Sequence, residues 1–292
     1  MIVERVGIVA KQGLTAAAPH LAQLIDWLAQ RRVETILETE TATLADLRHQ
    51  PALSRDALPS QVDLVLVLGG DGTLLSMAAR VAASGRAIPI LGVNFGRLGF
   101  LTEITLDELY PALEAALAGT ARVHERRLLA AQTLREGVAG ERHFVLNDVV
   151  VTRGEISRVI DLEVIVNGQF VTRVKADGVI IASPTGSTAY NLAASGPIVH
   201  PEVDAILLTP IAPHALANRP VVIAGSSVVE VRPIDPLRQT DIFVTFDGQT
   251  GRKLGEADTV QVARADVVVR LVSSSSRGYF DTLREKLGWG ER

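Results

Sequence analysis

Hydrophobic and polar positions follow strand-like and helix-like spacings in turn along the first hundred residues. Residues 5–10 and 62–68 are short apolar runs, typical of parallel strands buried on both faces. Residues 18–32 place leucine and isoleucine at the i, i+3, i+4, i+7 spacing of an amphipathic helix. Further strands are expected at 33–38 and 87–93. This alternation predicts an α/β N-terminal domain built on a doubly wound parallel sheet.

The pattern changes after about residue 120. Short β-rich runs follow one another, separated by Gly, Asn and Asp, and Asn167-Gly168 between two alternating runs predicts a hairpin. We therefore expect an α/β nucleotide-binding domain over residues 1–120 and an all-β, sandwich-like domain over 121–274. Residues 40–60 are expected to form a loop with a short helix, and the stretch from Tyr279 is expected to be helical.

Composition excludes several classes of protein. Hydrophobic residues make up 47% of the chain and charged residues 21%, which argues against disorder and against a coiled coil. The net charge of −4 gives no electrostatic footprint for nucleic acid or an anionic membrane. The absence of cysteine excludes disulfides, thiolate metal sites and cysteine nucleophiles. With neither a signal peptide nor an 18-residue apolar run, a cytoplasmic protein is expected.

The strongest chemical signal is the sequence GGDGT, which follows the strand at 62–68. Gly69 and Gly70 allow a ligand to approach the backbone, and the next helix directs its free amides toward an anion. Thr73 is expected to cap that helix or to donate its hydroxyl to a phosphate. Asp71 fits proton abstraction from an attacking hydroxyl, or contact with a metal that accompanies phosphates. The alternative is a plain turn with Asp71 as the helix cap.

Three other segments carry candidate binding groups. Residues 92–101 follow the next strand and offer the Asn94 amide, the Phe95 ring and the Arg97 guanidinium, unless they form a simple βα loop. Asn147 and Asp148 open a strand, where an amide and a carboxylate can fork around a sugar diol or an adenine edge; the alternative is a turn.

Residues 173–201 form the richest of these segments. Thr185, Ser187, Thr188 and Tyr190 supply hydroxyl groups at the end of a strand, and Asp177 provides a second acid. The alternative is an ordinary Ser/Thr-rich loop. The six histidines show no clustered spacing, so no structural metal site is expected.

Together these segments resemble the NAD kinase family in order and spacing. The matching motifs are LGGDGTLL, GVNFGRLGFL, NDVVVTRG, DGVIIASPTGSTAYNLAASGPIVHP, PHALANRPVVI and FDGQ. GGDG also occurs in lipid kinases of the diacylglycerol and sphingosine type, whereas PTGSTAYNLAASGP is much more specific. The resemblance implies transfer of the γ-phosphate of ATP to the 2′-hydroxyl of the adenosine ribose of NAD. It also implies an active site between the two domains, and return of residues 275–292 to the first.

The resemblance further assigns roles to individual residues. Asp71 corresponds to the proton acceptor, with Gly72 beside it at the substrate, and Mg²⁺ is expected to arrive with ATP rather than to be fixed by side chains alone. NAD and ATP are the expected substrates, and a homodimer or homotetramer is the expected assembly, without nucleic acid or membrane partners. A lipid kinase and a non-catalytic dinucleotide sensor are the alternatives. The implied NAD contacts are Asn147, Asp148, Arg158, Lys175, Asp177, Thr188, Ala189, Tyr190, Asn191, Leu192, Ala193 and Gln249.

Overall fold

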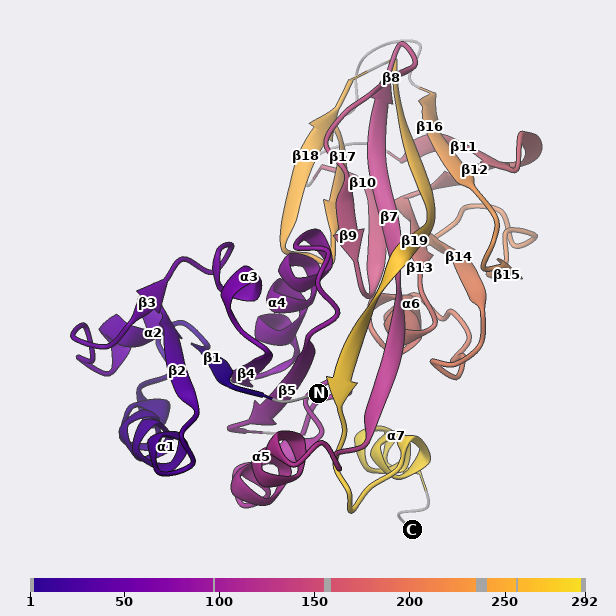
Figure 1. Cartoon of the computed structure of the whole chain (residues 1–292). Helices are drawn as coiled ribbons and strands as arrows, with labels where there is room; N and C mark the ends of the chain where they lie inside the picture. The colour runs from indigo at the N-terminus through magenta and orange to yellow at the C-terminus, as the bar shows by residue number, and fades with distance from the viewer. Residues whose placement is uncertain (1–2, 97, 155–158, 235–240, 256, 290–292) are drawn as a thin grey trace. The chain divides into compact units, whose positions relative to one another are not determined.

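The chain folds into two compact units, which are described separately. Unit 1 comprises residues 1–125 and 269–292, and unit 2 comprises residues 126–268. Figure 1 shows the course of the chain through both. The candidate residues Arg97 and Arg158 lie outside the described residues. The structure is a computed structural model, and it describes residues 3–96, 98–154, 159–234, 241–255 and 257–289.

Unit 1 is built on a parallel sheet, as the sequence predicts. The strand order is β19-β5-β4-β1-β2-β3, and β6 also pairs with β5. The pairs among β1 to β6, and the pair of β19 with β5, are all parallel. The strands are β1 (Arg5–Ala10), β2 (Glu34–Glu38), β3 (Ala52–Leu53), β4 (Leu64–Leu68), β5 (Pro89–Asn94), β6 (Ile104–Thr105) and the end of β19 (Asp258–Val272).

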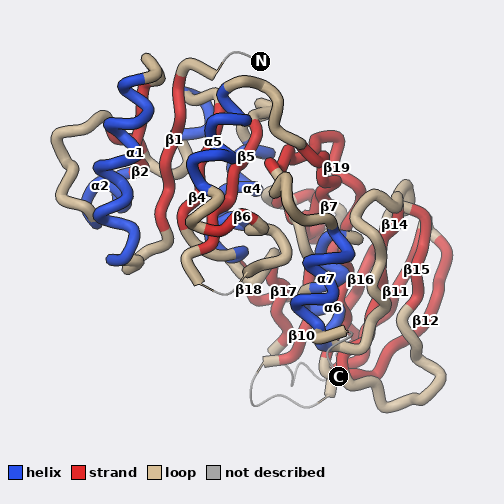
Figure 2. Tube along the Cα trace, turned by 90° about the horizontal axis from the view of Figure 1, so that it is seen from below, coloured by secondary structure: helices blue, strands red, loops and turns tan. Residues whose placement is uncertain are grey.

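Helices cover both faces of this sheet. Helices α1 and α5 share one apolar cluster with β1, β4 and β5. Because side chains alternate along a strand, Gly7 and Gly92 face the other side, where Leu58 of α3 and Leu74 of α4 pack close to them. Figure 2 shows α1 beside β2 and α4 beside β4. The helices are η1 (Thr15–Ala17), α1 (Ala18–Gln30), α2 (Thr39–Leu44), α3 (Leu58–Gln61), α4 (Asp71–Ala83), α5 (Leu109–Leu117) and α7 (Tyr279–Leu287).

The order of the strands creates a topological switch point between β1 and β4. From β1 the chain crosses to β2 on one side, and it later returns to β4 on the other side. In open α/β sheets, ligands bind outside the carboxyl ends of the strands at such a point. Here the carboxyl end of β1 leads into Lys11 and that of β4 into Gly69, and the Lys11 amide donates to the Leu68 carbonyl at 2.8 Å. The fold therefore places the GGDGT sequence where a ligand is expected.

Unit 2 is a sandwich of two antiparallel sheets. One has the order β15-β14-β13-β10-β17-β18, and the other contains β12-β11-β16-β19 with β7, β8 and β9. Their inward side chains form one apolar cluster. The remaining strands are β7 (Val123–Arg135), β8 (Val138–Ala139), β9 (His143–Val145), β10 (Asp148–Arg153), β11 (Ile160–Val166), β12 (Gln169–Ala176), β13 (Gly178–Ala182), β14 (Ala205–Ile211), β15 (Val221–Ala224), β16 (Val229–Ile234), β17 (Ile242–Phe246) and β18 (Thr250–Leu254).

Several local predictions are confirmed, and one is refined. Asn167 and Gly168 join β11 to β12 with φ values of 50° and 75°, the positive values that a tight hairpin turn requires. The helix expected from Tyr279 is α7, which ends at Gly288 with a left-handed φ of 66°. The 40–60 segment holds the end of α2 and part of α3, and thus parts of two short helices. The predicted fold class is confirmed.

Candidate active site

The GGDGT sequence forms the junction between β4 and α4. The N-cap residue of α4 is Gly70, no side chain caps the helix, and Asp71 is the first helical residue. Thr73 lies in the first turn, so its expected capping role is wrong. The alternative role of Asp71 as a helix cap is also wrong, because its carboxylate turns away from the helix and binds another loop.

The Asp71 carboxylate accepts four hydrogen bonds from the loop that follows β5. Its Oδ1 atom accepts from the backbone amides of Leu101 and Thr102, at 3.1 and 3.0 Å, and from the Thr102 hydroxyl at 2.8 Å. Its Oδ2 atom accepts one bond, from the Phe100 amide at 2.8 Å. Each carboxylate oxygen has about two lone-pair sites, so Oδ2, with one bond from the described residues, keeps one open. Asp71 is thus fixed in orientation while one oxygen stays available.

Thr102 and Asn94 support this arrangement. Thr102 is fully buried, and its hydroxyl accepts a bond from the Asn94 side-chain amide at 3.0 Å while donating to Asp71. The Asn94 side-chain oxygen accepts from the Gly96 amide at 2.7 Å. A Cβ on Gly99 would lie 2.0 Å from Asp71 Oδ1, so the absence of a side chain there is required. The Asn94 side-chain amide, which the sequence offers as a ligand group, therefore orients the loop that binds Asp71.

A pocket of about 400 Å³ opens at this junction. Asp71 is the one carboxylate among its lining residues, and Phe95, whose contact with a base stays a prediction, also lines it. No Cβ clash would arise at Gly70, whereas a Cβ on Gly69 would lie 2.9 Å from both Lys11 Cβ and Thr73 Oγ1. The lining residues are Lys11, Leu14, Gly69, Gly70, Asp71, Asn94, Phe95, Gly96, Leu98, Gly99 and Lys286.

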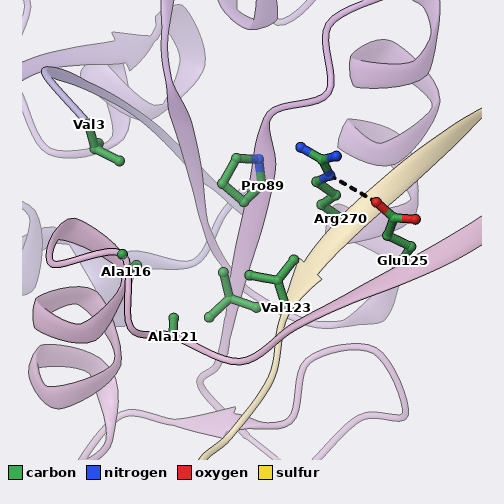
Figure 3. Close-up of a pocket in the computed structure, with 9 residues that line it drawn as sticks. Val3, Pro89, Ala116, Ala121, Val123, Glu125 and Arg270 are labelled. Carbon is green, nitrogen blue, oxygen red and sulfur yellow. Dashed lines mark hydrogen bonds and ion pairs between the residues drawn. The ribbon is translucent and has the colours of Figure 1, made fainter. Parts of the chain in front are cut away.

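A second pocket of unit 1, of about 380 Å³, has different chemistry. Figure 3 shows Arg270 and Glu125 directed toward each other. Their ion pair joins Nε to Oε1 at 3.2 Å, and small apolar side chains such as Val123 and Ala121 also line the pocket. This ion pair neutralises the charge of the pocket, which suits a phosphate ligand poorly. The pocket beside Asp71 is therefore the candidate site in unit 1.

Unit 2 carries the second group of predicted residues, at the start of β10. Asp247 accepts hydrogen bonds from the backbone amides of Leu146, Asn147 and Asp148, at 2.9, 2.7 and 3.1 Å. Within the described part of the chain, the Asn147 side chain has no hydrogen-bond partner, so both its oxygen and its amide are available to a ligand. Gln249 lies in the same turn as Asp247 and is exposed.

Asp148 is buried at 6% exposure close to a second carboxylate. Burial, followed by the charge of Asp247, raises the pKa of Asp148 to about 7, and a hydrogen bond from the Tyr190 backbone amide partly opposes the rise. Burial also raises the pKa of Asp247, against the lowering effect of the three backbone amides. The two acids therefore titrate as a coupled pair.

We expect this pair to make stability fall as the pH rises. A carboxyl whose folded pKa exceeds its unfolded value stabilises fully below the unfolded value, about 3.9 for Asp, and loses that contribution as the pH rises through about 7. The free energy of unfolding should fall by at most about 1.4 kcal/mol per pH unit for each of the two carboxyls in that window. Urea unfolding from pH 4 to 8 measures it, and Asp148→Asn should flatten the profile. The control Asp266→Asn, at an exposed surface acid, should not.

The loop predicted to bind NAD covers the outer face of the six-stranded sheet. It comprises η2 (Thr185–Thr188) and α6 (Tyr190–Ala193), and the residues that follow pack on that face. Asn191 is fully buried: its side-chain nitrogen donates to the Ser187 and Pro197 carbonyls, both at 3.0 Å, and its side-chain oxygen accepts from the Thr209 hydroxyl at 2.7 Å. Tyr190, in contrast, is 45% exposed. The remaining loop residues that the sequence singles out are Thr188, Ala189, Leu192 and Ala193, all partly or fully exposed.

The last predicted contacts lie near the β12–β13 connection. Asp177 forms an ion pair with Arg153, with Nε to Oδ1 at 2.7 Å, and the Arg153 amide donates to the Asp177 carbonyl at 3.0 Å. Lys175 is exposed on β12, and its carbonyl accepts from the His214 amide at 2.9 Å. The charge of Asp177 is therefore balanced by Arg153 within the protein.

Sequence reasoning missed Thr102, Asp247 and Arg153. Asp247 stands within FDGQ and Arg153 within NDVVVTRG, so both lie inside recognised motifs, but Thr102 follows its motif and carries no signal of its own. Across the described ranges no three acidic or histidine side chains cluster as metal ligands. No described helix is long and apolar enough to cross a membrane.

The site and the fold can now be compared with known proteins. The profile of the ATP-NAD kinase N-terminal domain matches residues 6–121, and that of the ATP-NAD kinase C-terminal domain matches residues 146–274. An NAD kinase of Geobacter metallireducens is 50% identical over 272 residues, covering 92% of this chain and 93% of that protein. An NAD kinase of Geobacter sp. strain M21 is 48% identical over 295 residues, covering 99% and 100%.

Solved structures agree with this assignment. The yeast NADH kinase complexed with NADH gives a TM-score of 0.91 at 25% identity, covering 100% of this chain and 89% of that one. An Archaeoglobus fulgidus NAD kinase in complex with ATP shares the fold, with a TM-score of 0.74 at 24% identity and 97% of each chain covered. The chain belongs to the ATP-NAD kinase family. Its activity is the ATP-dependent phosphorylation of NAD to NADP, which sets aside the lipid-kinase and sensor alternatives.

Proposed function

We propose that this chain transfers the γ-phosphate of ATP to the 2′-hydroxyl of the adenosine ribose of NAD, with Asp71 as the proton acceptor. The observation that carries this proposal is the way the loop after β5 binds Asp71. Its four hydrogen bonds fix the carboxylate and leave one lone pair of Oδ2 open beside a pocket. Phosphoryl transfer passes through a loose transition state, so a weak but well-oriented base suffices. The hydroxyl proton passes to Oδ2 as the new P–O bond forms and the bond between the γ-phosphorus and the β–γ bridging oxygen of ATP breaks, so that ADP leaves and NADP is formed.

The glycines of the loop serve the phosphate groups. Gly70 leaves open space where a side chain would stand, and Gly69 has no room for one. Oxygens of the transferred phosphate can therefore approach the backbone amides at the start of α4, where the helix dipole favours negative charge. Gly72 directly follows Asp71 and is exposed. In this proposal it lies beside the acceptor hydroxyl.

Unit 2 is proposed to bind NAD. Asp247 binds the backbone amides of Asn147 and Asp148 and so fixes the positions of these two residues. The free Asn147 side chain and the Asp148 carboxyl can then act as a fork around a ribose diol. The exposed Tyr190 ring offers a stacking surface. The remaining proposed NAD contacts are Arg158, Lys175, Asp177, Thr188, Ala189, Asn191, Leu192, Ala193 and Gln249, of which Arg158 lies outside the described residues.

A divalent cation is proposed to enter the pocket of unit 1 together with ATP. Mg²⁺ in nucleotide sites keeps substrate phosphates and water among its ligands, so it needs no dedicated side-chain cage here, and the open lone pair of Asp71 Oδ2 stays available for the proton. When bound with ATP, Mg²⁺ would neutralise charge on the phosphates. Chelation by EDTA is expected to abolish NADP formation, and added Mg²⁺ should restore it. Undiminished NADP formation in EDTA would contradict this requirement.

One assay tests the proposed reaction. Purified protein is incubated with NAD and Mg-ATP, and the product is detected with an NADP-specific dehydrogenase, which does not accept the 3′-phosphate isomer. A product that this enzyme does not oxidise or reduce would place the phosphate elsewhere than the 2′-hydroxyl. The dimer or tetramer stays a prediction that light scattering can measure, and the cytoplasmic location also stays a prediction.

A further inference from the structure

Two lysines from opposite ends of the chain line the pocket beside Asp71. Lys11 directly follows β1, and Lys286 lies in the last turn of α7. Both belong to unit 1, and both line the same pocket as Gly69, Gly70 and Asp71. Neither residue belongs to a recognised motif, and in the described part of the chain neither donates a hydrogen bond to Asp71.

The fold fixes Lys11 at the topological switch point. Its backbone amide donates to the Leu68 carbonyl at 2.8 Å, which places its Cα beside the end of β4. Its Cβ lies where a Cβ of Gly69 would clash, so the Lys11 stem runs directly along the glycine loop. Within the described residues, no hydrogen bond or ion pair engages the Lys11 ammonium, and the side chain is exposed. Its charge is therefore available to a ligand in the pocket.

Lys286 lines the same pocket from α7. Its Nζ atom donates to the Leu98 carbonyl at 2.6 Å and lies 5.6 Å from the centre of the Phe100 ring. An ammonium has three N–H groups, so this bond leaves two free. The neighbouring cation of α7, Arg284, is paired with Asp281 instead. Lys286 is thus the cation that α7 contributes to this pocket.

The charges of the pocket suit a polyanion. Asp71 contributes one negative charge and the two ammonium groups contribute two positive charges, so the lining carries a net positive charge. Without the two lysines, the negative charge of Asp71 would repel a phosphate chain placed in this pocket. Because Lys is a compact point charge with rotatable donors, a pair of lysines can follow successive phosphates.

We propose that Lys11 and Lys286 bind the phosphate chain of the nucleotide donor, from the β1 side and from the C-terminal helix respectively. This inference rests on the proposed function, which puts the donor in this pocket. It assigns the last helix of the chain a direct contact with substrate. Lys286 also donates to the Leu98 carbonyl, in the loop that binds Asp71. Loss of Lys286 should therefore lower turnover as well as donor affinity. Loss of Lys11 should act on donor affinity.

Binding of inorganic tripolyphosphate to the full-length protein tests the proposal without turnover. Titration calorimetry should show that Lys11→Met and Lys286→Met each weaken tripolyphosphate binding about 10-fold or more, as expected for a lost charge-assisted hydrogen bond. Lys286→Arg should retain most of the affinity. The matched control Lys253→Met removes a surface lysine of unit 2 that pairs with Asp241, and it should bind as the wild type does.

Steady-state kinetics provides the second measurement. Both Met variants should raise KM for ATP about 10-fold or more while KM for NAD changes less than about twofold. A double variant that binds tripolyphosphate within about twofold of the wild type would overturn the proposal. Thermal melting and NAD titration identify a misfolded variant. Lys11→Arg and Lys286→Arg then decide, since either one with about 10-fold weaker tripolyphosphate binding and a wild-type melt contradicts the proposal. If the wild type forms no NADP, the proposed function fails, yet the tripolyphosphate result still stands by itself.

Discussion

Asp71→Asn is expected to cut turnover by about 10²-fold or more, within the range for loss of a general base. Asparagine has nearly the same shape, and its carbonyl oxygen can accept the bonds that Leu101 and Thr102 give to Oδ1. An amide nitrogen in place of Oδ2, however, cannot take a proton. It also faces the Phe100 amide, a second donor, so one hydrogen bond is lost. Stability should fall by about 1–2 kcal/mol.

The measurement is kcat at saturating ATP and NAD, together with NAD binding by calorimetry and a thermal melt. The control Asp56→Asn removes an exposed acid of the same unit, which pairs with Arg80, and should leave turnover unchanged. A kcat of Asp71→Asn within about threefold of the wild type would remove Asp71 from the base role. Loss of NAD binding as well as turnover would instead make Asp71 a substrate-binding residue.

The elements of the fold could be predicted because their signals are local. The apolar run of β4 and the periodicity of α1 each lie within one element, and Asn167-Gly168 encodes its own turn. The position of Asp71 at a strand end could be predicted for the same reason. These signals depend on neighbours in sequence, which the chain shows directly.

The contacts that orient the site residues could not be predicted in this way. Asp71 bonds a loop 29 to 31 residues away, and Asp247 bonds amides 99 to 101 residues away. Lys286 lies 188 residues from its partner Leu98. Such pairs depend on strand order and register, for which the sequence has no local pattern. The capping role expected for Thr73 is wrong for a related reason, since the exact start of α4 decides which residue is the cap, while its contact with a phosphate stays a prediction.

Gly186→Ala is expected to destabilise the protein by about 3 kcal/mol or more, at the upper end for overpacking. An added Cβ would lie 2.1 Å from the Asn147 carbonyl oxygen and 2.4 Å from its carbon, which are backbone atoms. Neither side can move freely. Ser183 donates its amide to that carbonyl at 2.8 Å and its hydroxyl to the Leu146 carbonyl at 2.5 Å, while Asp247 holds the 146–148 amides.

The clash should also weaken NAD binding, because any relief separates Asn147 and Asp148 from the loop that carries Tyr190. Urea unfolding measures the stability and calorimetry measures the NAD affinity, which we expect to fall about 10-fold or more for a displaced pair of polar contacts. Gly70→Ala is the matched control, since its Cβ meets nothing within 4 Å. Its stability should change by less than about 0.5 kcal/mol. Equal stability of the two variants would mean that the Asn147 backbone yields, and that the tight contact at Gly186 does not hold the NAD loop in register.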